Sequence, residues 1–145
     1  MRGREAALRR RRVGASLTDE ARRRAAAGPP ALSAEELDDR RYTITDLLDD
    51  LSATADRGER LFIAIELARR TGELALAVGG SWNGGGKWLA RRLDSTAPGL
   101  GTRLHHALHE ELEDRVEPLT DVVEEVLDQA GRRLWEGYKR GATAS

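Results

Sequence analysis

The chain has 145 residues, a length that suits one compact domain and excludes a large multidomain enzyme. Charged residues make up 34% of the chain and aromatic residues only 4%, so a core must come from Leu, Val, Ile and Ala, which favours helices. Cysteine is absent, which excludes a disulfide framework and a thiolate metal site, and no apolar run reaches the roughly 20 residues of a membrane span. These features predict a cytoplasmic protein.

The formal net charge of −1 conceals two oppositely charged parts. Residues 1–28 hold nine Arg against three acidic residues, a charge of +6 that leaves −7 for the remainder. We expect a loosely attached arm with short helices, one ending near Val13 and another over about 18–27. The run 28–30 (Gly-Pro-Pro) then ends any helix, because proline cannot continue the hydrogen-bond ladder. A plain solvated helix explains the arm better than a nucleic-acid contact, since no aromatic residues interleave the arginines.

Two long helices are predicted next. Ser33, with Glu36 three residues later, forms a capping box ahead of a helix over about 34–53. Asp56 repeats the cap before a second helix that ends near Val78. Apolar residues fall nearly all the way round this second helix, so we expect it to be central and largely buried.

Glycines over 79–86 break the chain before a short predicted helix over Lys87–Asp94, which Pro98 follows. Thr102 is available as the cap of the next helix, and Pro118 suits the first turn of the last one. The last helix carries one apolar stripe that Trp135 and Tyr138 border: Leu119, Val122, Val123, Val126, Leu127, Ala130 and Leu134.

No alternating strand pattern of four or more residues competes with these helices. The predicted fold is therefore all-α, an antiparallel four- to five-helix bundle with a basic N-terminal arm. We assign residues 1–30 to the Arg-rich arm and its Gly-Pro-Pro linker, 31–141 to the bundle and 142–145 to a disordered tail.

The stretch 79–88 (GGSWNGGGKW) is the most unusual in the chain. Glycines let backbone amides approach a ligand, Lys87 supplies a cation, and the N-terminus of the following helix attracts anions. It is not a Walker A loop, because Ser81 stands where that motif needs glycine and Trp88 where it needs Ser or Thr. Two hypotheses remain: a helix connection whose Trp82 and Trp88 fold back into the core, or a loop that contacts phosphate or another polar ligand.

A second candidate site lies on the first long helix, where Tyr42 precedes an acidic run. Asp46 and Asp50 stand four residues apart, so they share a helix face and suit a cationic group or a catalytic base. An ordinary solvated helix face explains the same pattern, and we prefer that explanation.

Three histidines, at positions 105, 106 and 109, resemble a metal cluster at first sight. The His-Glu-x-x-His pattern is absent and spacing identifies no third ligand, so we predict no metal site. Arg103 and His109 are separated by five residues, which resembles the Arg-x4–6-His motif of HEPN-type helical ribonucleases. Leu104 stands where that motif usually has a polar residue, so the ribonuclease pair is an alternative hypothesis only.

Four motifs follow one another along the chain: Ala27-Gly28-Pro29-Pro30, Arg41 to Leu51 (RYTITDLLDDL), Gly80 to Leu89 (GSWNGGGKWL) and Leu134 to Tyr138 (LWEGY). This succession resembles the C-terminal helical region of actinobacterial nucleotidyltransferase-domain proteins, which are relatives of aminoglycoside nucleotidyltransferases. In that family the helical bundle closes over the acceptor substrate. The resemblance implies that the residues on the substrate side or at a domain contact are Tyr42, Asp46, Asp50, Trp82, Lys87, Trp88 and Trp135.

The family's catalytic half is a separate α/β domain that binds the nucleotide through a Gly-Ser motif and metal-binding aspartates. Two metal ions there stabilise the attacking and leaving oxygens. Nothing before residue 30 suits that domain, so Mg²⁺ and a nucleotide are implied only for a missing catalytic domain, and we expect no cofactor in this chain.

The resulting expectation is an auxiliary substrate-binding domain that is not catalytic alone. Its expected partners are a separate catalytic nucleotidyltransferase domain or a second copy of the chain, with a small-molecule acceptor but neither a membrane nor nucleic acid. The alternatives are the HEPN-like ribonuclease and a bundle that mediates only protein contacts.

Overall fold

The computed structural model describes residues 18–24 and 26–131. Every regular element in these ranges is a helix, which confirms the predicted all-α bundle. The chain divides into two compact units after Pro30, and the first of them is helical over residues 18–24 and 26–27. The rest of the predicted arm, the predicted tail and the Trp135 to Tyr138 border lie outside the described residues.

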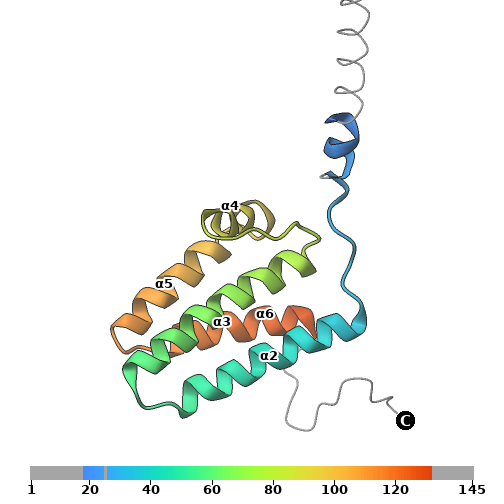
Figure 1. The fold of residues 1–145 in the computed structure, drawn as a ribbon. Helices are drawn as coiled ribbons and strands as arrows, with labels where there is room; N and C mark the ends of the chain where they lie inside the picture. The colour runs from blue at the N-terminus through green and yellow to red at the C-terminus, as the bar shows by residue number, and fades with distance from the viewer. Residues whose placement is uncertain (1–17, 25, 132–145) are drawn as a thin grey trace, which may run out of the picture. The chain divides into compact units, whose positions relative to one another are not determined.

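The second unit contains five helices within the described residues: α2 (Ala34–Ala53), α3 (Arg57–Val78), α4 (Lys87–Thr96), α5 (Leu100–Leu112) and α6 (Glu117–Ala130). Figure 1 shows α2, α5 and α6 running alongside α3, with α4 across one end. Helix α3 contacts each of the other four, so the prediction that it is the central helix is confirmed.

Local capping explains where these helices begin. The Ser33 side chain accepts a hydrogen bond from the Glu36 amide at 3.0 Å, and Asp56 accepts one from Glu59 at 2.9 Å, as predicted. The predicted Thr102 cap is wrong. Helix α5 begins at Leu100 after Gly99, whose φ of 85° is a left-handed conformation that glycine adopts without strain, so the helix starts three residues earlier than a Thr102 cap predicts.

The core lies where the inner faces of α2, α3, α5 and α6 meet. Its most deeply buried apolar side chains are Ile44, Leu51, Leu67, Leu74, Leu76, Leu119, Val123 and Leu127. The expectation that α3 is largely buried needs correction at two apolar positions, because Phe62 is 76% exposed and Ile65 is 48% exposed. Helix α4 covers only the C-terminal half of the adjoining face of α3, and the N-terminal half stays open to solvent.

A glycine determines how closely α4 lies on α3. A Cβ atom at Gly72 would meet the Cδ1 atoms of Leu93 and Leu89 at 3.2 and 3.3 Å. The missing side chain therefore lets two leucines of α4 rest directly on the backbone of α3. This contact positions α4 and the loop before it.

Candidate functional site on α4

The loop between α3 and α4 runs back along α4. Its start is held by the Ser81 amide, which donates to the Leu76 carbonyl at 2.9 Å, and by the Ser81 hydroxyl, which lies 2.5 Å from the hydroxyl of Thr96 near the end of α4. Further along, a Cβ atom at Gly84 would lie only 2.8 Å from the Cβ of Trp88, near the start of α4. The loop is thus anchored at both ends of the helix.

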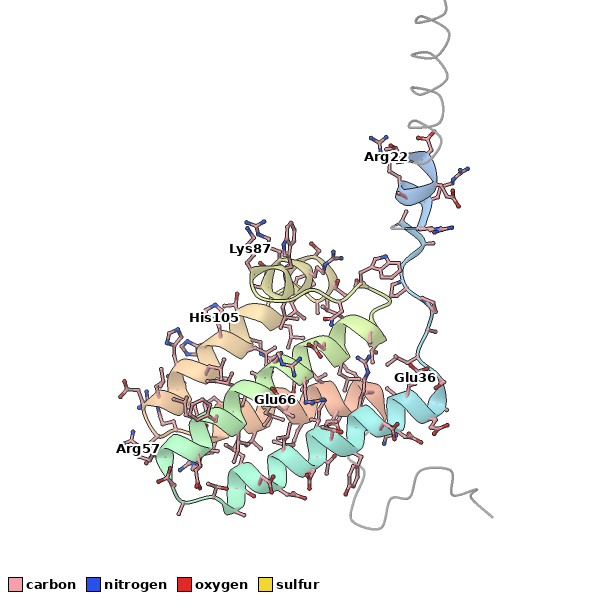
Figure 2. The ribbon with its side chains drawn as sticks, viewed as in Figure 1. Arg22, Glu36, Arg57, Glu66, Lys87 and His105 are labelled. Carbon is pink, nitrogen blue, oxygen red and sulfur yellow. The ribbon has the colours of Figure 1, made fainter. Side chains whose placement is uncertain are left out.

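Cationic side chains surround the indole of Trp88, on the part of α4 that carries the labelled Lys87 in Figure 2. The Lys87 Nζ lies 5.8 Å from the ring centroid and the Arg91 Cζ lies 5.0 Å from it, both within cation–π range. The Arg92 side chain lies beside Gly84, as does the Cβ of Trp88, and its buried Nε has no hydrogen-bond partner within the described residues. Two cations therefore lie over one exposed aromatic ring, and a third packs against the loop next to the same tryptophan.

These three cations are exceptional because most basic side chains of the bundle are neutralised. Within residues 31–131 the Arg and Lys side chains that form ion pairs with carboxylates are Arg41, Arg57, Arg60, Arg69, Arg70, Arg103 and Arg115. In the same range four basic side chains form none: Arg40, Lys87, Arg91 and Arg92. Three of these four stand on α4, whose single acidic residue is Asp94. Positive charge without a carboxylate partner is concentrated on this helix.

The tryptophans do not fill the core. Trp82 is 38% exposed and Trp88 is 50% exposed, which contradicts the hypothesis that both fold back as core residues. The core beneath α4 is closed by Leu93 and partly by Leu89 instead. The indole of Trp88 is therefore accessible to a ligand.

The remaining predicted ligand residues lie on another helix. Tyr42, Asp46 and Asp50 are all exposed on α2, where Asp46 and Asp50 stand one helical turn apart as predicted. Within the described residues α2 and α4 do not touch. The structure therefore brings Lys87 and Trp88 together, with Trp82 in the loop beside them, but does not bring the three α2 residues to this site.

The ribonuclease pair does not converge on α5. Arg103 and His109 are six positions apart, which at about 100° per residue leaves them roughly 120° apart around the helix. Arg103 donates to Glu125 of α6, and this hydrogen bond raises the pKa of Arg103 and lowers that of Glu125. His109 instead places its ring edge to face with His105, at 6.1 Å between centroids. No group of three or more metal-ligating side chains that could hold an ion occurs among the described residues.

Sequence reasoning missed a buried ion pair between α3 and α5. Arg60 donates to Glu111 at 3.2 Å and to Asp114 at 3.1 Å, and the Glu111 side chain is almost fully buried. Burial raises the pKa of Glu111, although the Arg60 guanidinium opposes that shift. A charged residue at a core position of α5 is the signal that identifies this pair, because an unpaired carboxylate is rarely buried.

An apolar groove also opens between α3, α4 and α5. It encloses about 230 Å³ and is lined mainly by Ile65, Ala68, Leu89, Leu93, Leu104 and Leu108. Phe62 of α3 and Leu112 of α5 are also exposed. The α3 face that α4 leaves uncovered is thus apolar and open to solvent.

Comparisons of the chain with models of protein families, with curated proteins and with solved structures find no match. The nucleotidyltransferase resemblance therefore stays a prediction. None of the described helices is long and apolar enough to span a membrane.

Proposed function

We propose that the bundle is an auxiliary ligand-binding domain of nucleotidyltransferase type, not catalytic by itself, that holds a phosphorylated ligand with a planar ring at α4. The observation that carries this proposal is the cluster of Lys87, Arg91 and Arg92 around the exposed ring of Trp88. Phosphate oxygens accept strong charge-assisted hydrogen bonds from such cations. An indole face offers a stacking surface to a nucleobase or a similar ring.

The beginning of α4 strengthens the attraction for an anion. Helix α4 starts after Gly86 without a side-chain cap and without an acidic residue in its first turn. No carboxylate of α4 therefore neutralises the positive end of this helix dipole, although the amides of Trp88 and Leu89 already donate to the carbonyls of Gly85 and Gly86. Gly85 and Gly86 leave the backbone before Lys87 accessible, because a Cβ at either position would meet no atom within 4 Å.

The two alternative functions have less support. The ribonuclease hypothesis needs Arg103 and His109 at one reaction centre, but Arg103 is engaged by Glu125 and the two residues diverge around α5. The protein-contact hypothesis rests on Trp135 and Tyr138, which lie outside the described residues.

The test is a titration of the purified chain with three probes. ATP carries both chemical features, inorganic phosphate carries only the anion, and adenosine carries only the ring. Tryptophan fluorescence and calorimetry should both report ATP binding that is tighter than binding of either fragment and that weakens as salt increases. Absence of any response to ATP contradicts the proposal.

Matched variants locate the binding. The Arg91→Gln/Arg92→Gln variant should weaken ATP binding at least tenfold, because each charge-assisted hydrogen bond contributes about 1.5–3 kcal/mol. Trp88→Ala should reduce the affinity for ATP but not for inorganic phosphate. Arg57→Gln removes an exposed arginine at the far end of α3 and should bind ATP as the wild type does. Equal losses in Arg57→Gln and in the α4 variants would mean that ATP binds through unspecific charge attraction.

A further inference from the structure

A fourth basic residue, Arg40, forms no ion pair at contact distance within residues 31–131, although its charge interacts with that of Glu36 one turn earlier, and it points to a second site. Arg40 of α2 lies at a hollow of about 180 Å³ between α2 and α3, which Ile44, Arg70 and Glu73 also line. Ile44 is only 1% exposed, so the floor of the hollow is apolar. Figure 2 labels Glu66, which marks this part of α3 one turn before Arg70. The hollow lies on α2 and α3, whereas the proposed ATP site lies on α4.

The carboxylates near this hollow are already engaged by α3 itself. Glu66 accepts hydrogen bonds from Arg69 and, at 2.7 Å, from the Nε of Arg70. Glu73 accepts one from the Nη1 of Arg69 at 2.6 Å. The Nη1 and Nη2 groups of Arg70 and the whole Arg40 guanidinium therefore keep their hydrogen-bond donors for another partner within the described structure. With Glu36, which interacts with Arg40, the three arginines and three glutamates carry no net charge, so the hollow offers unused hydrogen-bond donors and not an excess of positive charge.

Two guanidinium groups line this hollow with a single carboxylate, Glu73, which already accepts a hydrogen bond from Arg69, so a further anion between Arg40 and Arg70 would reduce their mutual repulsion. A phosphate group has four oxygens, so each of the two guanidinium groups can bind a separate pair of oxygens in the bidentate geometry that arginine prefers. A carboxylate offers only two oxygens and can satisfy one guanidinium fully. A water molecule needs only about 10–15 Å³ of such space, so a hollow of about 180 Å³ has room for a phosphate group.

We propose that Arg40 and Arg70 form a phosphate-binding site that clamps α2 to α3. The ligand is inorganic phosphate or the terminal phosphate of a small phosphomonoester whose remaining atoms project into solvent. Because the bound phosphate joins two helices of the folded bundle, it stabilises the fold by an amount that grows with the logarithm of the phosphate concentration once this exceeds the Kd.

The test measures thermal unfolding in phosphate and in sodium chloride at equal ionic strength, in the Arg91→Gln/Arg92→Gln background so that the α4 site does not contribute. Phosphate should raise the unfolding temperature more than chloride does, and acetate should have little effect. Arg40→Gln and Arg70→Gln should each abolish this difference, whereas Arg40→Lys should keep only part of it. Glycerol phosphate serves as the phosphomonoester probe and should act like inorganic phosphate if the ligand is exchangeable.

Arg57→Gln is the matched control and should keep the full phosphate effect. NMR titration with phosphate provides a second measurement that does not depend on stability, with shifts expected at the amides of Ile44 and Glu73. Equal stabilisation by phosphate and chloride, or an unchanged phosphate effect in Arg40→Gln, overturns the proposal. Failure of this test leaves the proposed function standing, because ATP binding at α4 is measured separately in the chain with Arg91 and Arg92 intact.

Discussion

At Gly72 an added methyl group has two opposing effects on stability. It raises the helix propensity of α3, and it takes space from the contact between α3 and α4. A Cβ at this position would lie 3.2 Å from Leu93 and 3.3 Å from Leu89, so Ala requires small shifts of two flexible leucine ends. Replacing glycine by alanine inside a helix gains about 0.8–1.0 kcal/mol. We therefore expect Gly72→Ala to leave the free energy of unfolding within about 1 kcal/mol of the wild type.

Gly72→Val adds two further methyl groups to the same contact, where no space remains for them. Overpacking of this kind costs about 1–3 kcal/mol and should push α4 away from α3. Because α4 carries Lys87 and Trp88, the same variant should also weaken ATP binding.

Urea unfolding followed by circular dichroism measures the stability of both variants, and tryptophan fluorescence measures their ATP affinity. Gly72→Ala serves as the matched control, since it keeps the helix and adds only one methyl group. A Gly72→Val protein as stable as the wild type would refute the claim that this glycine determines how closely α4 packs on α3.

Three further predictions concern stability. Phe62→Ser should lower the free energy of unfolding in urea by less than about 0.5 kcal/mol, because Phe62 is mostly exposed. Leu67→Ala, at a fully buried position of the same helix, should lower it by about 2–5 kcal/mol. Similar losses in the two variants would show that this face of α3 is covered in solution. Glu111→Ala should destabilise the chain by about 1–3 kcal/mol, because it leaves the largely buried Arg60 with only the more exposed Asp114 as a carboxylate partner. Glu111→Gln, which can still accept from Arg60, should lose clearly less, and equal losses would argue against the ion pair. Arg103 lowers the pKa of Glu125 below its ordinary value of 4.5, so the folded state binds that proton less readily than the unfolded state does. This stabilisation is present above pH 4.5 and is lost as the pH falls through the lowered pKa, so Arg103→Gln should lose less stability than the wild type in acid unfolding curves; identical curves would contradict the assignment.

The predicted helices were confirmed where local chemistry determines them. Ser33 and Asp56 carry their capping partners three residues away in the same chain segment, so sequence spacing alone identifies both helix starts. The cap of α5 was predicted wrongly because the choice between Gly99 and Thr102 depends on the backbone conformation of Gly99, a property that residue type does not reveal.

The candidate site was predictable only in part. The sequence by itself determined that Lys87 and Trp88 lie together at the start of one short helix, because they are consecutive residues that directly follow the glycine-rich loop. Only the tertiary structure decided that Trp88 stays exposed and that Asp46 and Asp50 lie away from α4. It also decided that Arg40 of α2 and Arg70 of α3 line the same hollow. The tertiary structure also decided which basic side chains form ion pairs. Arg60 and Arg103 lie next to carboxylates of other helices, whereas Lys87, Arg91 and Arg92 form no ion pair within the described bundle. The physical reason is that such partners are brought together by helix packing, which spacing along the chain does not specify.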